Sequence, residues 1–173
     1  MNAQDFKQAA RRFASGVTVV TTRRDREIHG ITASAFVTLS LDPLQVLVSI
    51  NAGSRLHGMI LESGHFAINV LREEQRAISH YFASPSRPTC IDEFPEIACR
   101  AHVTGAPVLE DCLAHFDCRL AATYPGGDHT IFIGDVLSAA GGEGAPLLYF
   151  DGDYRGMRDW GAHSAGNGVA HKR

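Results

Sequence analysis

The sequence predicts a mainly β protein, built as a small antiparallel barrel with a few short helices. Several segments alternate apolar and polar residues, as half-buried strands do, whereas only three short segments have helical spacing. Regular helices do not separate these strands, as the βαβ units of a doubly wound sheet would require. The chain of 173 residues shows no internal repeat and no domain boundary, so we expect one domain over 1–160 and a disordered tail over 161–173.

The strand predicted over residues 31–41, ITASAFVTLSL, is the most informative segment. Its odd-numbered positions are apolar, and its even-numbered positions carry hydroxyl groups except at Phe36. Because strand side chains alternate between two faces, we expect the apolar face to pack in the core. The hydroxyl face either meets solvent or receives a polar, planar ligand, and the alternation alone leaves both interpretations open.

The remaining elements follow from the same kinds of pattern. Ser54 is placed to cap a helix that ends at Gly64, and Asp42-Pro43 ends the strand over 31–41. The stretch 84–107 contains four prolines and little periodicity, which predicts a long, lid-like loop. Helices are expected over 3–14, 54–62 and 73–82, and further strands over 17–23, 45–51, 66–71, 113–124, 129–139 and 147–150.

The composition excludes several classes of protein. A formal charge of −3 without a basic stripe argues against binding to nucleic acid or to a membrane surface. No apolar run reaches the roughly 18 residues of a membrane span, and the N-terminus lacks a signal-peptide core. The four cysteines contain no CxxC pair and the nine histidines form no HxH or HExxH pattern, so no metal site is expected. These features predict a cytoplasmic protein with reduced thiols.

Polar residues recur at corresponding edges of successive predicted strands, whereas nucleophile motifs and phosphate-binding loops are absent from the sequence. These polar residues face solvent, or some are buried beside apolar neighbours and need a partner such as a ligand. Ser54 and Arg55 form either a helix cap with a surface arginine or an anion site. GGEGAP at 141–146 is typical of a turn. The recurring residues are Thr32, Ser34, Ser49, Asn51, Asn69 and His129.

Five segments, in this order, resemble the short-chain flavin reductases, which are the small components of two-component flavin-dependent monooxygenases. The resemblance runs from about Phe6 to Arg155. The segments are FASGVTVVTT (13–22), HGITASAFVTLSLDPLQVLVSIN (29–51), HFAINVLREEQRAISHYFA (65–83), GDHTIFIGDV (127–136) and PLLYFDGDYR (146–155).

This resemblance implies a flavin-binding split β-barrel with Greek-key connections, present as a homodimer with flavin near the subunit interface. It implies an NAD(P)H:flavin oxidoreductase that passes a hydride from NADH or NADPH to FMN or FAD. The reduced flavin then goes to a partner monooxygenase. Because the cofactors carry such chemistry, the protein supplies orientation and electrostatics and needs no conspicuous catalytic constellation.

The site segments of the family fall on matching positions of this chain. His129, the histidine of the GDHT motif, is linked by the resemblance to the nicotinamide and is the one catalytic residue that it implies. Where the family often has N-[RK]-S-S-S-T-H, residues 51–57 are NAGSRLH, which leaves the choice between FMN and FAD open. The implied cofactor-binding residues are Thr32, Ala33 and Ser34 at the flavin ring and ribityl chain; Ser49, Ile50 and Asn51 in a second wall; Ser54 and Arg55 on the phosphate side; Asn69, Val70 and Leu71 as a third contact; and Tyr154 and Arg155 in a closing segment.

Three other hypotheses fit parts of the sequence. The first is a non-catalytic flavin- or haem-binding split-barrel protein, and the second is an interaction module whose hydroxyl face meets water. The third is a small barrel oxidase of a phosphorylated amine, which would need more basic residues at the phosphate end than this chain has. Oxidation of NADH in the presence of added flavin separates the reductase from the first two.

Overall fold

Strands dominate the computed structural model, which describes residues 1–157. The tail expected over 161–173 lies outside these residues. The helices are α1 (Ala3–Ala10), α2 (Arg55–Ser63), α3 (Arg76–Ala83) and a short 3-10 turn, η1 (Glu73–Gln75). The strands are β1 (Ser15–Gly16), β2 (Thr18–Arg24), β3 (Glu27–Ala33), β4 (Phe36–Leu41), β5 (Leu44–Asn51), β6 (His65–Val70), β7 (Cys90–Ile91), β8 (Cys99–Ala101), β9 (Pro107–Leu109), β10 (Ala114–Gly126), β11 (His129–Gly141), β12 (Leu148–Phe150) and β13 (Asp153–Arg155).

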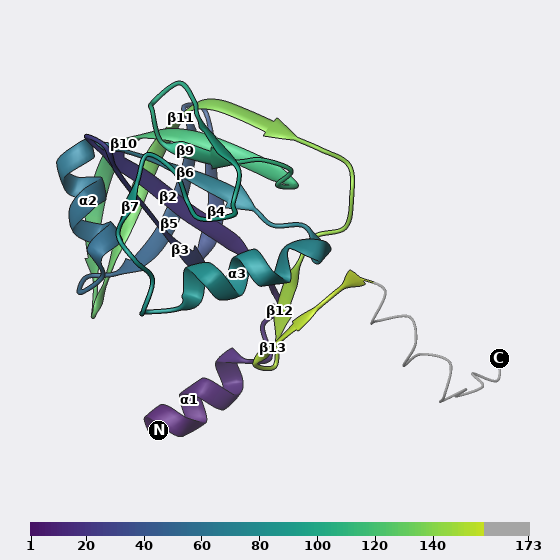
Figure 1. Cartoon of the computed structure of the whole chain (residues 1–173). Coiled ribbons are helices and arrows are strands. Elements are labelled where there is room, and N and C mark those ends of the chain that lie inside the picture. The colour runs from purple at the N-terminus through teal and green to yellow at the C-terminus, as the bar shows by residue number, and fades with distance from the viewer. Residues whose placement is uncertain (158–173) are drawn as a thin grey trace.

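Eight of these strands form one sheet in the order β4-β5-β11-β10-β6-β2-β3-β7, and every neighbouring pair in it is antiparallel (Figure 1). The sequential pairs β2–β3, β4–β5 and β10–β11 are hairpins, while β6 lies between β2 and β10 and β5 lies beside β11. The ladder does not close on itself. In a separate small sheet, β12 pairs with both β1 and β13, which brings the end of the described chain back to its beginning. The prediction of a mainly β, antiparallel fold is confirmed.

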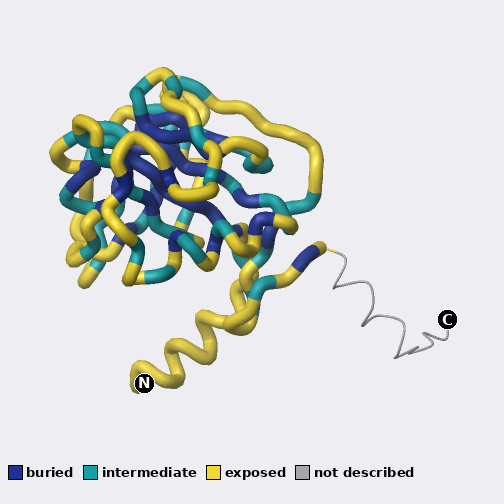
Figure 2. The backbone as a smooth tube through the Cα atoms, in the orientation of Figure 1, coloured by how far each residue is buried: buried dark blue, intermediate teal, exposed yellow. Residues whose placement is uncertain are grey.

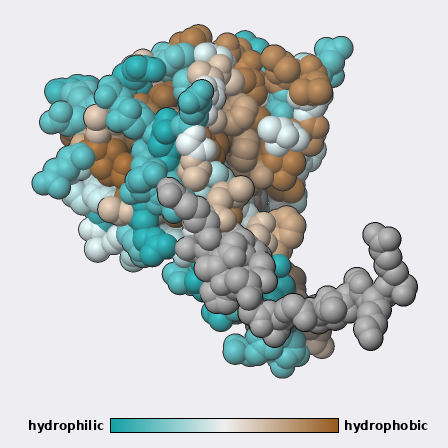
Figure 3. Space-filling view, turned by 90° about the vertical axis from the view of Figure 1, so that its right-hand side faces the viewer, coloured by the Kyte–Doolittle hydropathy of each residue, from teal (hydrophilic) through white to brown (hydrophobic). Residues whose placement is uncertain are grey.

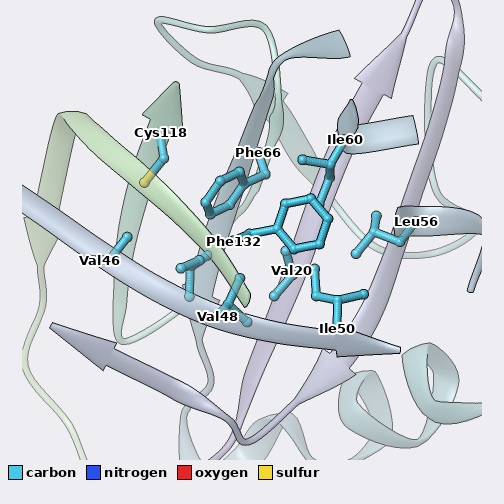
Figure 4. Close-up of a cluster of buried hydrophobic side chains, with 10 residues drawn as sticks. Val20, Val46, Val48, Ile50, Leu56, Ile60, Phe66, Cys118 and Phe132 are labelled. Atoms are coloured by element: carbon cyan, nitrogen blue, oxygen red, sulfur yellow. The ribbon is translucent and has the colours of Figure 1, made fainter. Parts of the chain in front are cut away.

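The main core lies between the large sheet and α2 (Figure 4). Phe66 and Phe132 meet near its centre, and Leu56 and Ile60 reach it from α2. β2 is buried on both of its faces: Val20 belongs to this core, whereas neighbouring Val19 belongs to a second cluster beneath α3. This double burial explains why residues 17–22 show no polar alternation.

The helix α3 lies close against β3 because Gly30 leaves room for the ring of Phe82. A Cβ atom at Gly30 would come within 2.8 Å of that ring. The buried face of α3, which carries Phe82 and Ser79, is therefore held next to the end of β3.

The long strand predicted over residues 31–41 is wrong as a single element. The chain leaves the ladder at Ser34 and Ala35, and β4 begins at Phe36 as the edge strand beside β5. The alternation does not carry over this break. Phe36 packs on the core, with its ring centroid 5.3 Å from that of Phe116, whereas the side chains expected inside are exposed. These are Val37 (52% exposed), Leu39 (43%) and Leu41 (87%).

The helices were predicted more accurately than this strand. Ser54 caps α2 by accepting from the His57 N–H, and Gly64 ends the helix with a left-handed φ of 71°. The loop predicted over 84–107 holds only the short strands β7 and β8 and the start of β9. Within the described residues no helix has the length and apolar character needed to span a bilayer.

The first helix differs from the rest of the chain in its exposure. α1 is shorter than predicted, carries no buried residue and projects from the body of the molecule (Figures 1 and 2). Asn2 and Asp5 form a capping box at its start, so local hydrogen bonds rather than packing define the helix.

Candidate functional site

Three hollows meet at Ser34, just beyond the end of β3. Ser34 lines a hollow of about 450 Å³ together with Lys7 and Arg11 of α1, and a hollow of about 390 Å³ together with Phe36 and Val70. The third, which we call the Ser34 hollow, has a volume of about 220 Å³ and is lined by Val17, Thr32, Ser34, Ala83, Tyr149 and Tyr154. The structure therefore brings three of the sequence-predicted site residues, Thr32, Ser34 and Tyr154, around one space.

The last residues of β3 are fixed by hydrogen bonds to other elements. Thr32 Oγ1 donates to the carbonyl oxygen of Ser79 on α3 at 2.7 Å. Thr18 Oγ1 on β2 donates to the carbonyl oxygen of Ala33, also at 2.7 Å. Ser34 follows directly and is exposed, so its side chain borders the three hollows from a well-held strand end.

Tyr154 on β13 forms the opposite wall of the Ser34 hollow, and α3 holds it. Its hydroxyl lies 2.7 Å from Ser79 Oγ. The ring of His80 packs edge-on against the Tyr154 ring with centroids 4.9 Å apart, and the Arg76 guanidinium lies 5.6 Å from the Tyr154 ring centroid. Aromatic faces and hydroxyl groups thus line the hollow together, a combination suited to a planar ligand with polar edges.

A second group of predicted residues meets at the ends of β5 and β11, and we call residues 51–54 with 128–129 the loop end. Asn51 is the register partner of His129 across the two strands, and Ala52 N–H donates to Asp128 O at 3.0 Å. Asn51 Oδ1 accepts from Gly53 N–H at 2.9 Å, and the Ser54 hydroxyl caps α2. The pairing of β5 with β11 thus brings the two segments together, and short-range bonds hold the side chains of Asn51 and Ser54.

His129 lies on the surface of the loop end, with 42% of its side chain exposed. Its Nδ1 lies 2.7 Å from Asp128 Oδ1, and this hydrogen bond and the charge of His129 lower the pKa of the Asp128 carboxyl. The carboxylate therefore fixes the orientation of the ring and leaves the other ring nitrogen available for a ligand.

Ser49 connects the two groups. Its backbone N–H donates to Ala35 O at 3.0 Å, directly after Ser34, and Asn51 follows two residues further along β5. The neighbouring Ile50, also predicted as a site residue, is 1% exposed, and its side chain packs in the core.

Arg55, predicted on the phosphate side, already has protein partners. Its Nη2 lies 2.5 Å from Glu27 Oε1, and its Nη1 donates to Thr89 Oγ1 at 2.8 Å. Glu27 is shared with Arg24, whose Nη2 lies 3.0 Å from the other carboxylate oxygen. The charge of Arg55 is thus partly compensated, although 46% of its side chain remains exposed.

Asn69 and Leu71 are fully buried, on either side of half-buried Val70. The Asn69 side-chain amide donates to Val19 O at 3.0 Å and to Thr21 Oγ1 at 3.2 Å, and its carbonyl oxygen accepts from Leu109 N–H at 2.8 Å. The Asn69 side chain is therefore already hydrogen-bonded to protein groups in the core. Val70 is the residue of this segment that lines a hollow with Ser34.

Two features lie apart from these groups. Arg155 is exposed on β13, with its nearest charge contact to Asp153 at 3.9 Å. Another hollow, of about 350 Å³, has Arg100, Cys112 and His115 in its lining, and none of the predicted site residues lines it. Among the described residues, no group of three or more His, Cys, Asp or Glu side chains is arranged to hold a metal ion.

His29, on the same strand as Thr32, has a strongly shifted pKa. Burial lowers it to about 4, and the positive charges of Arg87 and Arg55 act in the same direction. The imidazole of His29 is therefore neutral near pH 7. Arg87 lies 3.4 Å from its Nε2 and donates to Gly30 O at 2.6 Å, which ties the loop after α3 to β3.

Sequence reasoning missed Ser79 and Tyr149, which hold or line the Ser34 hollow. A helix was predicted over residues 73–82, but the prediction did not identify Ser79 as one of its buried residues. The available signal was the spacing of Arg76, Ser79 and His80, which places three polar side chains on one helix face.

Hydroxyl groups, aromatic walls and nearby arginines on a mainly antiparallel, open sheet have the features of a ligand-binding split-barrel protein. The model of the flavin reductase like domain matches residues 10–158. The chain therefore belongs to the flavin reductase-like family, as the resemblance in its sequence indicated, and the predicted split-barrel fold is confirmed.

Individual relatives agree with this assignment. The chain is 42% identical over 152 residues to the reductase component of 4-hydroxyphenylacetate 3-monooxygenase from Thermus thermophilus, covering 87% of this chain and 93% of that protein. It is 36% identical over 155 residues to an NADH-dependent flavin reductase from Rhodococcus, covering 88% and 85%. Among solved structures, the Streptomyces globisporus NADH:FAD oxidoreductase in complex with NAD and FAD fragments superposes with a TM-score of 0.81 at 31% identity, covering 89% and 92%.

Proposed function

We propose that this protein is an NAD(P)H-dependent flavin reductase that supplies reduced FMN or FAD to a partner monooxygenase. The match of the flavin reductase like domain over residues 10–158 carries the proposal. The convergence of Thr32, Ser34 and Tyr154 on one hollow supports it independently, because these residues come from β3, its end and β13.

The chain's own residues bind and orient the ligands in this proposal. Thr32, Ala33 and Ser34 meet the polar edge of the flavin through side-chain and backbone groups, with Tyr154 opposite them. Ser49, Ile50 and Asn51 form a second wall of the flavin site. The segment Asn69–Leu71 forms a third contact, which Val70 makes with its half-buried side chain. Ser54 and Arg55 are assigned to the phosphate side of the flavin, and Arg155 to the closing segment that also carries Tyr154.

The flavin, when bound, supplies the ring that accepts a hydride from the nicotinamide. The protein holds both rings in place, which is where a positioned site gains most of its rate. His129 orients the nicotinamide or its amide from the loop end, while Asp128 fixes the imidazole. Backbone N–H groups near Ser34 favour negative charge on the ring edge.

One assay tests the activity. NADH or NADPH oxidation is followed at 340 nm with FMN, FAD or riboflavin added in turn, together with flavin fluorescence quenching. The proposal predicts oxidation with at least one pair of nucleotide and flavin. Flavin quenching without any oxidation would instead support the non-catalytic flavin-binding alternative. The absence of both quenching and oxidation would exclude the reductase and this alternative together.

A second copy of the chain is the first partner that we propose. Apolar side chains are exposed on neighbouring strands, and Figure 3 shows apolar residues gathered over the upper part of one side of the molecule. Such patches mark interaction surfaces, and a two-fold homodimer covers the same patch on both copies. The exposed apolar residues on β4, β5 and β11 are Val37, Leu39, Leu41, Leu44 and Leu137.

The oligomeric state tests this surface. Leu39→Asp is expected to convert a dimer to a monomer in light scattering because it places a charge inside the proposed interface. Leu61→Asp, at a leucine of similar exposure on α2, is the matched control and should remain dimeric. A dimer that tolerates Leu39→Asp would contradict this choice of surface.

The second partner is a monooxygenase that takes up the reduced flavin, as in the two-component system named for the Thermus relative. Coupled turnover with a purified flavin-dependent monooxygenase tests the transfer of reduced flavin. Because reduced flavin can diffuse, this transfer requires no complex between the two proteins.

We also propose that the protein is cytoplasmic. Its four cysteines are free, and Cys90 and Cys118 are buried, in keeping with a reducing compartment.

A further inference from the structure

One buried serine joins the two walls of the Ser34 hollow. Ser79 is 0% exposed and lies on α3, whose last residue, Ala83, also lines the hollow. Its carbonyl oxygen accepts from Thr32 Oγ1 at 2.7 Å, and its hydroxyl lies 2.7 Å from the Tyr154 hydroxyl. A single residue thus contacts β3 on one side and β13 on the other.

The neighbours of Ser79 on the same helix face hold the same tyrosine. Arg76 Nη2 donates to Tyr154 O at 3.0 Å and lies over its ring, and His80 packs against that ring. Since residues at i, i+3 and i+4 share one face of a helix, Arg76, Ser79 and His80 form a cradle for Tyr154. In this cradle Ser79 makes the only recorded bond to the Tyr154 hydroxyl among the described residues.

The position of α3 is itself fixed. Gly30 admits the Phe82 ring, and the Arg87 guanidinium, which donates to Ser84 O and Gly30 O, ties the end of the helix to β3. A rigid helix that bonds both walls sets the distance between them, which is how supporting residues pre-organise a site.

We propose that Ser79 is a positioning residue of the flavin site: it fixes the spacing of Thr32 and Tyr154 and so the width of the Ser34 hollow. This inference rests on the proposed function. Ser79 is fully buried: its backbone carbonyl holds Thr32, and its hydroxyl, the group that Ser79→Ala removes, holds Tyr154. Its loss is expected to weaken flavin binding more than it slows the chemical step.

The test uses Ser79→Ala, Tyr154→Phe and the double variant, with Tyr81→Phe as the matched control on the same helix. The Tyr81 hydroxyl contacts Cys90 Sγ at 3.6 Å and lines no hollow at Ser34. Each protein is measured for flavin Kd by fluorescence quenching, for kcat and KM with saturating NADH, and for melting temperature.

We expect each single variant to raise the flavin Kd and KM by about threefold to tenfold, the range of one hydrogen bond, with kcat changed less. The double variant should be no worse than either single variant, because both remove the same bond. Tyr81→Phe should stay within about twofold of the wild type.

Three outcomes are decisive. Variants that fold but keep the wild-type flavin Kd and KM, or single effects that multiply in the double variant, overturn the role of Ser79. Should the wild type reduce flavin while Ser79→Ala changes only the melting temperature, Ser79 is structural and the proposed function stands. A wild-type protein that neither binds nor reduces any flavin would contradict both the role of Ser79 and the proposed function.

Discussion

The Ser34 hollow and the loop end differ in how their side chains are held. Around the hollow, Thr32 and Tyr154 bond to Ser79, which is far from both along the chain. At the loop end, the recorded side-chain bonds of Asn51, Ser54 and His129 reach no further than three residues. Tertiary contacts therefore hold the side chains of the hollow. At the loop end, the pairing of β5 with β11 brings the segments together, but local bonds hold their side chains.

This contrast assigns different tasks to the two regions. Groups that distant elements hold keep their geometry when a ligand arrives, which suits recognition of a rigid ring. Locally bonded surface groups exchange partners at little cost, which suits a second ligand that binds and leaves in every turnover. We therefore expect mutations behind the hollow to change stability and flavin affinity, and mutations at the loop end to change mainly nucleotide kinetics.

The largest expected effect compares two asparagines. Asn69→Ala leaves the Leu109 N–H and the Val19 carbonyl without their side-chain partner in a fully buried place, and we expect a loss of about 2–4 kcal/mol in the free energy of unfolding. Asn51→Ala removes only a local turn bond on the surface and should cost less than about 0.5 kcal/mol. Urea titrations of both variants measure these values, and equal losses would break the distinction between the regions.

The next prediction concerns pH, and it tests the buried surroundings of β3. The pKa of His29 is about 4 in the folded protein, against the ordinary value of 6.5 expected after unfolding. Below pH 6.5 the His29 imidazole binds a proton in the unfolded chain but stays neutral in the folded chain until the pH approaches 4. The contribution of His29 to the free energy of unfolding is therefore fully present above pH 6.5 and decreases as the pH falls toward 4.

We expect His29 to account for a loss of about 2 kcal/mol over that range, with burial as the main cause. His29→Gln should flatten this part of the stability curve, measured by chemical denaturation at several pH values. A variant with the same acid-induced loss as the wild type would show that other groups cause it.

How far the sequence predicts this molecule depends on the range of the interactions. Ser54, Gly64 and the pattern of short strands act locally, so the capped helix α2 and the mainly β fold could be predicted from the residues alone. The faces of β4 could not, because the break at Ser34 and Ala35 depends on pairing with β5, which is a contact of the folded state.

The site shows the same limit. The resemblance placed Thr32, Ser34 and Tyr154 in one site, and the structure brings them to one hollow. It also placed Asn69 there, whose amide is committed to bonds inside the core. The polar spacing of Arg76, Ser79 and His80 marks one helix face, but it does not identify the partners of Ser79, which are distant in sequence.

A smaller effect is expected at the loop end. His129→Ala should raise the KM for NADH by about threefold to tenfold with little change in melting temperature, because the ring is exposed and, within residues 1–157, has Asp128 as its side-chain partner. Asp128→Asn, which removes the charge that orients the ring, should act in the same direction but less strongly. An unchanged KM and turnover in His129→Ala would remove His129 from the nucleotide site.

Arg55 provides the smallest and finest test, because it is a surface residue that distant groups nevertheless hold. Since Glu27 and Thr89 already bind its guanidinium, Arg55→Ala should weaken flavin binding only by about twofold to threefold, and more at low salt. Glu27→Gln frees the guanidinium and should strengthen flavin binding by a similar factor, so the two variants shift the fluorescence titration in opposite directions. If both leave the flavin Kd unchanged at every ionic strength, the ion pair only braces β3 against α2, and the phosphate side of the site must be sought among Lys7 and Arg11 of α1, beside Ser34.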